Sequence, residues 1–432
     1  MSRLSRLLAL AFACLSAVFL YGSARLLMAS LYAIADTPSS VAHALEWTPG
    51  DAVLHLRYAG LWRNTPENVK VRAHLATAVA LNPRLTTARL ALADLMENTG
   101  EVSRAEALLL DAAKLDHQFD PAWALANFYF RQGNRPRFEE WLGRAAAMAY
   151  EGGRPLFALA WRAELPPEFV VRRIVRGREA MARSMLAFSV DAKTPDWAAV
   201  AAPALLAVAT REDQDLLYSV VEMLLYAGRI KDAEGIWNRI PGRRPELAAT
   251  GLGFDWRLRR MPGVRMSAAS GLHVEFVDPE AAAYDLASRI APVSPGGPRL
   301  LTAQSQSDEM PRGFRWTVSS WPGLHVLAVL DLHPGRLPQS DSVSFEVPPG
   351  VHAVHVLLSY ERPVGALRFS GTLDIPSVLV ETKVRRRAPE KELVGEIRGS
   401  AQEVSLDKKE ETARFDASKG ATRIDLTAPP AR

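Results

Sequence analysis

Small groups of residues recur along the first half of the chain at intervals of 33 or 34 positions. Three pairs carry this spacing: Pro49 and Pro83, Ala88 and Ala122, and Gly100 and Gly133. Two helices joined by a short turn occupy about this length. Because one such hairpin cannot bury its apolar face alone, similar hairpins stack on one another. The spacing therefore predicts an α-solenoid, and the alternative is a helical domain whose spacing is coincidental.

A second signature supports paired helices. Each of three glycines is followed five positions later by a small or aromatic packing residue: Gly100 by Ala105, Gly133 by Phe138, and Gly228 by Ala233. Glycine suits the left-handed turn that ends a helix, and the later residue is placed to pack the next helix.

These residues resemble the tetratricopeptide repeat (TPR) family. The best-matching segments are Leu81–Asp116, Asp120–Ala149 and Leu216–Pro241. The tryptophan and tyrosine that the family has in its first helix are mostly replaced, and Gly153–Val200 shows no clean period. The resemblance implies a groove that binds peptides or protein surfaces, and therefore a scaffold that binds protein partners through its helical repeats.

The N-terminus predicts a membrane segment. Arg3 and Arg6 precede an uncharged, mostly apolar run from Leu7 to Ala24, which as a helix approaches the thickness of the hydrocarbon core. Positive charge before the run predicts that the N-terminus lies on the cytoplasmic side of the membrane and that the rest of the chain lies in the periplasm. A cleaved signal peptide ending near residues 22–24 or 33–35 is the alternative, and a lipoprotein site at Cys14 fits poorly. All three readings export the body.

From about Gly251 the pattern changes to short runs with a period of two. About seven strands are expected, at residues 272–276, 314–318, 325–332, 343–347, 354–360, 367–375 and 378–384. Turn clusters rich in proline and glycine separate them, as at residues 294–298 and 348–350. This spacing predicts an antiparallel β-sandwich of the jelly-roll kind.

The order of these pieces also resembles carbohydrate-binding modules. The residues that carry the resemblance lie at 253–258, 272–278, 291–303, 345–358 and 369–380. Together with upstream TPR-like repeats, it implies an envelope protein linked to polysaccharide assembly or export. Such modules often hold calcium through paired carboxylates late in the last strand. Here Asp374 is followed by Ile375-Pro376, so that pair is missing.

Three tryptophans are candidate sugar platforms. Trp316 alternates with Phe314 and Val318, which predicts a core position. Trp256 and Trp321 are expected at loop edges, where a ring can contact a ligand, and these two are the speculative ligand-binding residues.

Composition and motifs exclude several functions. The net charge of +4 is spread over 52 basic and 48 acidic residues, so no nucleic-acid partner is expected. The single cysteine excludes an intramolecular disulfide. Nucleophile elbows, HExxH and P-loops are absent. We therefore expect no enzyme activity, no catalytic residues, no cofactor and no bound metal.

These observations divide the chain into four parts. Residues 1–37 form the membrane or signal segment, 38–250 the TPR-like repeats, 251–384 the β-sandwich, and 385–432 a disordered charged tail. The expected function is a non-enzymatic, membrane-anchored scaffold in the cell envelope. The alternative is a glycan-binding protein that acts through the sandwich, with the repeats as a spacer. A polysaccharide-processing enzyme is a third reading, which only scattered carboxylates support.

Overall fold

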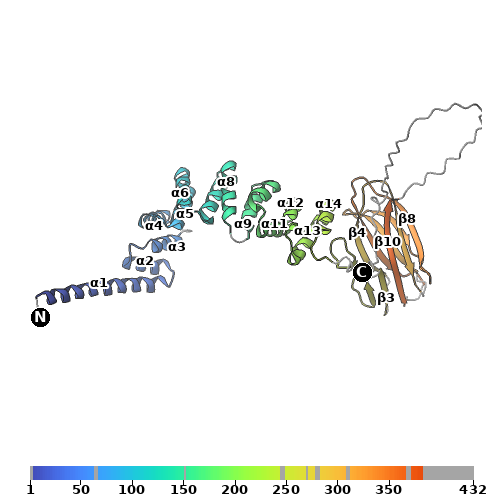
Figure 1. Ribbon diagram of the computed structural model, residues 1–432, viewed down its shortest axis with the longest axis horizontal. Helices are drawn as coiled ribbons and strands as arrows, with labels where there is room; N and C mark the ends of the chain where they lie inside the picture. The colour runs from blue at the N-terminus through green and yellow to red at the C-terminus, as the bar shows by residue number, and fades with distance from the viewer. Residues whose placement is uncertain are drawn as a thin grey trace, which may run out of the picture. The chain divides into compact units, whose positions relative to one another are not determined.

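The computed structural model describes residues 3–62, 67–149, 152–243, 249–268, 271–277, 283–307, 312–365 and 371–382. The tail expected over 385–432 lies outside these residues. The colours in Figure 1 show that the helices precede the strands along the chain. The chain divides into two compact units between Met181 and Ala182, within one helix.

The first unit contains α1 (Arg3–Ala33), α2 (Pro38–Trp47), α3 (Ala52–Leu61), α4 (Asn68–Leu81), α5 (Thr86–Asn98), α6 (Val102–Leu115), α7 (Phe119–Arg131), α8 (Arg135–Met148), α9 (Arg154–Arg162), α10 (Pro167–Val170) and the π-helical turn η1 (Val171–Val175). The helix α11 (Glu179–Asp191) crosses the division. The second unit continues with α12 (Pro195–Leu206), the 3-10 turn η2 (Arg211–Asp213), α13 (Gln214–Tyr226) and α14 (Ile230–Trp237). The predicted succession of helical hairpins is confirmed.

Five described turns, from the α5–α6 turn to the α13–α14 turn, are built in the same way. One residue with positive φ ends the first helix: Gly100 (85°), Gly133 (68°), Glu164 (51°), Lys193 (53°) or Gly228 (74°). The residue after it donates its N–H to the carbonyl five positions earlier, in the pairs 101→96, 134→129, 165→160, 194→189 and 229→224. This is the Schellman arrangement, which satisfies carbonyls left free at the helix end.

Two of these five hairpins were not predicted from the sequence, and they are the two that have no glycine at this turn. The α9–α10 turn has Glu164 and the α11–α12 turn has Lys193, both within the stretch that shows no clean period. Both side chains are exposed, so the helices on either side of each turn hold the backbone of these residues in a conformation that normally favours glycine.

Replacing Lys193 by glycine is therefore expected to stabilise the protein by about 0.5–1 kcal/mol, because it relieves the left-handed strain. Gly133→Ala introduces the same strain at an equivalent turn and is expected to destabilise by about 1–2 kcal/mol. Denaturant unfolding followed by far-UV circular dichroism measures both changes. A Lys193→Gly variant less stable than wild type would contradict the explanation.

The helix α1 is the one described helix that is long and apolar enough to cross a membrane, over Leu10–Ala33. A signal sequence passes the same test of length and composition. The apolar side chains of α1 from Leu10 to Leu20 are largely exposed, with Phe12 73% and Phe19 74% accessible. Nearer its end, Ala29 packs against α2, and Arg25 Nε donates to the Trp47 carbonyl at 2.8 Å.

The strands of the second unit form two five-stranded antiparallel sheets. Their bounds are β1 (Arg257–Leu258), β2 (Val264–Ser267), β3 (Leu272–Phe276), β4 (Ala283–Pro292), β5 (Pro298–Gln306), β6 (Phe314–Trp321), β7 (Val326–Asp331), β8 (Gln339–Glu346), β9 (Ala353–Glu361) and β10 (Gly371–Thr382). One sheet has the order β1-β4-β9-β6-β7 and the other β2-β3-β10-β5-β8. Most connections cross between the sheets, which is a jelly-roll arrangement, and the predicted β-sandwich is confirmed.

One strand expectation is corrected, and several strands were missed. The described parts of the runs expected at 367–375 and 378–384 belong to one strand, β10, whose pairing with β5 shifts register between Asp374 and Ser377. Pro376 lies at this shift and cannot donate to the ladder, so it interrupts the alternation without ending the strand. The strands β1, β2, β4 and β5 were not expected. In β4, an irregularity between Asp285 and Ala287 breaks the period of two.

Candidate partner-binding surfaces

Trp256 lies in the core of the sandwich, which corrects the expectation that it lies at an exposed loop edge. Its side chain is 1% accessible, and its ring lies 5.8 Å from that of Trp316. Trp316 is fully buried, as its alternation predicts. Neither ring has a free face for a sugar.

Trp321 is partly buried where the sandwich meets the last helical hairpin. Its indole N–H donates to the carbonyl of Leu225 at 2.8 Å, and its ring centroid lies 5.2 Å from that of Tyr226. Both partners belong to the end of α13. The structure therefore gives Trp321 a contact with the protein itself, between two modules of the second unit.

We call this junction the joint, and define it by six residues: Glu222, Leu225, Trp237, Gly253, Arg257 and Trp321. Its one carboxylate, Glu222, has two partners. Glu222 accepts from the backbone N–H of Gly253 and from Arg257 Nη2 at 2.8 Å. Trp237 packs edge-on against Phe254. These contacts fix the sandwich to α13 and α14 through charge-assisted bonds as well as aromatic packing.

A groove in the first unit has the composition of a peptide-binding surface. It encloses about 550 Å³ between α3, α4 and α5. Its apolar wall includes Leu56, Leu75 and Leu95. Asn68 and Asn98 lie on its rim, are exposed, and have no side-chain hydrogen bond to any described residue. Free amides beside an apolar wall can bond to the backbone of an extended segment.

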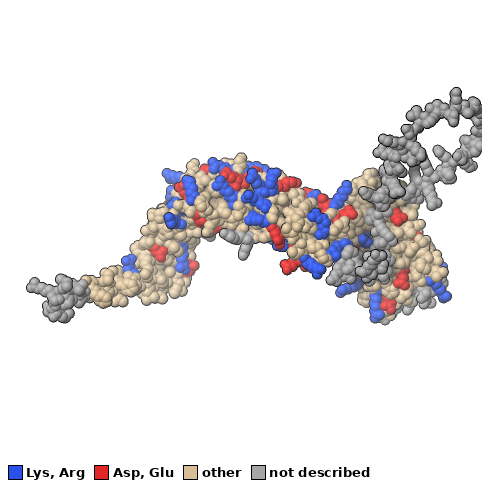
Figure 2. Space-filling view, in the orientation of Figure 1, with Lys and Arg blue, Asp and Glu red and all other residues tan. Residues whose placement is uncertain are grey.

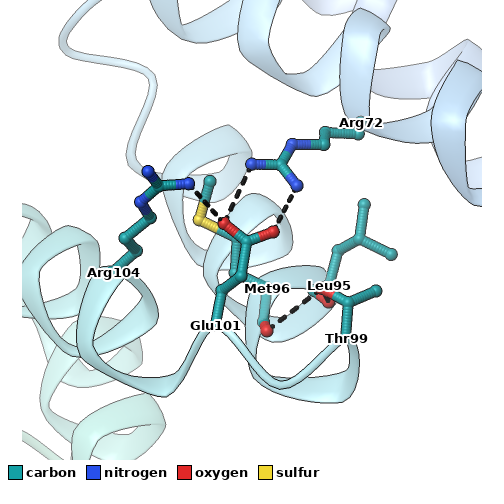
Figure 3. Close-up of polar contacts among 6 residues, drawn as sticks. All are labelled: Arg72, Leu95, Met96, Thr99, Glu101 and Arg104. Atoms are coloured by element: carbon teal, nitrogen blue, oxygen red, sulfur yellow. Dashed lines mark hydrogen bonds and ion pairs between the residues drawn. The ribbon is translucent and has the colours of Figure 1, made fainter.

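The rim of this groove is held by the ion-pair cluster in Figure 3. Arg72 of α4 donates two hydrogen bonds to Glu101, with Nη2 3.0 Å from Oε2, and Arg104 of α6 adds a third at 2.7 Å. Thr99, which lines the groove, donates to the carbonyls of Leu95 and Met96 at 3.0 and 3.2 Å. The cluster ties α4 to the turn between α5 and α6.

The hydrogen bonds from Arg72, and then those from Arg104, lower the pKa of Glu101 from 4.5 to about 2. The ionised carboxylate is thus favoured in the folded protein, and its contribution is present in full above about pH 4.5. We expect Glu101→Gln to unfold more readily than wild type at neutral pH. This difference should shrink as the pH falls through 4.5 and vanish near pH 2. Thermal melts of the two proteins across that range measure it, and a difference independent of pH would contradict the ion-pair explanation.

Two histidines join α3 to α4 beside the groove. His55 Nδ1 lies 2.9 Å from His74 Nδ1, and the ring of Tyr58 lies 4.3 Å from that of His74. Burial, and then the neighbouring His55, lower the pKa of His74. A hydrogen bond between two ring nitrogens requires one of them to be unprotonated, and the lowered pKa of His74 suits its ring to accept.

No group of three or more His, Cys, Asp or Glu side chains that could hold an ion occurs among the described residues. Asp374 lies 2.6 Å from His273 Nδ1 on the neighbouring strand.

The groove and its amides were not identified from the sequence. The repeat spacing predicts that hairpins stack, but it does not show which exposed positions of neighbouring helices converge. Asn68 and Asn98 are 30 positions apart and look like ordinary surface residues in the sequence.

Comparison with known proteins gives similarity of fold at low identity. No protein-family model and no curated protein sequence matches the chain. The TPR protein YrrB, which has an unusual peptide-binding site, is 13% identical, with a TM-score of 0.25 over 46% of this chain and 90% of its own. A CBM4 structure is 12% identical, with a TM-score of 0.22 over 27% of this chain and 77% of its own. The apo form of BiXyn10A CBM1 is 15% identical, with a TM-score of 0.20 over 27% and 79%.

The order of elements and the sheet topology define the class of protein. This chain combines TPR-like helical hairpins with a jelly-roll sandwich, after one apolar N-terminal helix.

Proposed function

We propose that the chain is a non-enzymatic adaptor that binds a segment of another protein in the groove between α3, α4 and α5. The observation that supports it is the pairing of an apolar wall with the unsatisfied amides of Asn68 and Asn98. An extended segment can place apolar side chains on the wall while its backbone bonds to the amides.

The proposal includes attachment to the cytoplasmic membrane through α1, with the body in the periplasm. The exposed apolar surface of α1 and the two arginines near its start, Arg3 and Arg6, support this placement. A reporter enzyme fused to the C-terminus of the full chain tests it: activity of a periplasm-specific reporter is expected, and activity of a cytoplasm-specific reporter would overturn it.

The groove is tested by site-specific photo-crosslinking in intact cells. A photoreactive side chain at Thr99, an exposed residue of the groove, is expected to capture a protein, and Ala91→Trp, which fills the groove, is expected to abolish that capture. Ala124→Trp is the matched control, because Ala124 is a partly buried position on α7 that does not line the groove. Thermal melting establishes that both variants fold. Capture that persists in the Ala91→Trp variant would refute the groove as the binding site.

A second candidate function is glycan binding through the outer face of the sheet β2-β3-β10-β5-β8. Thr302 and Gln304 of β5 lie opposite Ser342 and Ser340 of β8, so hydroxyl and amide groups form a row between buried positions. Binding of the full chain on a glycan array, lost on Gln304→Ala but kept on Trp321→Ala, would favour this function. It would also link the protein to polysaccharide assembly or export.

A further inference from the structure

Positive charge is concentrated in one stretch of the first unit. Residues 131–178 contain ten arginines, no lysine and five acidic residues, a net charge of +5, whereas the whole chain carries +4. The whole chain has nearly equal numbers of basic and acidic residues, but this segment is clearly basic. Figure 2 shows Lys and Arg gathered on the visible face of the helical part.

A cleft of about 770 Å³ opens within this stretch, between α8 and η1. Arg172, Arg173 and Arg176 of the segment around η1 line it, and all three are exposed. No described residue forms a hydrogen bond or ion pair with these guanidinium groups. The cleft joins the second helices of two successive hairpins, so it is a different surface from the groove between α3, α4 and α5.

The local backbone holds these arginines in place. The segment Val171–Val175 is a π-helical turn, and Arg176 ends it in the left-handed region with φ of 52°. Arg178 anchors the segment by donating to the carbonyls of Ala146, Ala149 and Ile174, two of which belong to the end of α8. Turns of this kind and left-handed non-glycine residues occur frequently at functional sites.

The opposite wall of the cleft limits the chemistry of the ligand. Glu139 and Glu140 of α8 lie there and are paired with Arg135 at 2.9 Å and Arg144 at 2.6 Å. A uniformly charged polyanion would bring some of its charges against these carboxylates. A polypeptide can place its carboxylates opposite the arginines and uncharged residues elsewhere.

Two further features favour a peptide. The guanidinium group binds a carboxylate through two parallel hydrogen bonds, a geometry that lysine lacks. Phe169 and Pro136 supply apolar surface within the cleft, which suits apolar side chains between the acidic ones.

From these observations we infer that the cleft between α8 and η1 binds an acidic segment of a partner protein, with Arg172, Arg173 and Arg176 receiving its carboxylates. This is a second site, and it does not depend on the proposed function of the groove.

The experiment measures binding of a fluorescent peptide of alternating Glu and Leu to the full chain in detergent by anisotropy, with a Gln–Leu peptide and a polyuronate for comparison. The Glu–Leu peptide is expected to bind, and more weakly at higher salt. The variant with Arg172→Gln, Arg173→Gln and Arg176→Gln is expected to lose at least about tenfold in affinity, since three charge-assisted contacts are removed.

A matched variant carries Arg84→Gln, Arg239→Gln and Arg336→Gln, which removes the same charge from exposed positions outside the cleft. It is expected to keep wild-type affinity. A second cleft variant with the three arginines changed to lysine keeps the charge and should bind with intermediate affinity. Circular dichroism confirms folding of each variant.

Three outcomes would overturn the inference. Equal binding by the two glutamine variants would show that the cleft is not the site. Equal binding of the Glu–Leu and Gln–Leu peptides would show that carboxylates are not recognised. Tighter binding of the polyuronate, lost in the cleft variant, would make the ligand an acidic polysaccharide.

Discussion

Replacing Gly253 by alanine is expected to destabilise the second unit by about 2–4 kcal/mol, through combined backbone strain and overpacking. Gly253 has a φ of 54°, and a Cβ atom there would lie 2.6 Å from Cε3 and 2.8 Å from Cη2 of Trp237. The ring of Trp237 is 3% accessible, so it has no free space into which to move. The same change would displace the N–H that donates to Glu222.

Gly251→Ala is the control for this prediction. Gly251 also has a positive φ, of 79°, but its Cβ would meet no atom within 4 Å. It therefore carries the strain of the backbone without the clash, and a loss of only about 1 kcal/mol is expected. Thermal unfolding compares the two variants, and limited proteolysis shows whether the segment between α14 and β1 becomes accessible. Equal losses would mean that the contact with Trp237 does not matter.

Replacing Trp316 by alanine is expected to cost about 3–5 kcal/mol, because a fully buried ring leaves a large cavity. Its ring fills the space between the sheets beside Trp256, and surrounding β-strands cannot collapse to close it. Chemical unfolding monitored by fluorescence of the remaining tryptophans measures the loss.

Two substitutions give the contrast. Trp316→Phe keeps most of the volume and removes a buried indole N–H that no described residue accepts, so its effect should be below about 2 kcal/mol. Trp321→Ala removes one hydrogen bond and a ring contact at the joint, and should act mainly on the attachment of the sandwich. A Trp316→Ala variant as stable as wild type would contradict the core assignment.

Sequence periodicity was sufficient to predict an element where a single local constraint, such as a left-handed turn or a buried strand face, decides the residue type. Gly100, Gly133 and Gly228 satisfy the left-handed turn of three hairpins, and alternation around Trp316 indicates its buried face. The pattern failed where tertiary packing replaces the local preference, as at Glu164 and Lys193, or where a bulge breaks the alternation of β4.

The binding surfaces were less predictable than the fold. Trp256 and Trp321 stand near turns in the sequence, but burial of an aromatic ring depends on which module covers it, and α13 covers Trp321. For the arginine cleft a signal was present: ten arginines without a lysine within 48 residues. Acidic residues elsewhere in the chain offset these arginines in the total net charge, so the net charge has to be counted segment by segment.

The attachment of α1 to α2 restricts how the N-terminus can be processed. Arg25 and Ala29 already belong to the folded body, through the Trp47 carbonyl and the apolar contact with α2. A signal peptidase that cut after Ala35 would remove both residues and expose the side chains that Ala29 covers. A cut after Ala24 would spare them. Any mature form that retains this packing therefore begins no later than Arg25, which N-terminal sequencing of the purified protein can read directly.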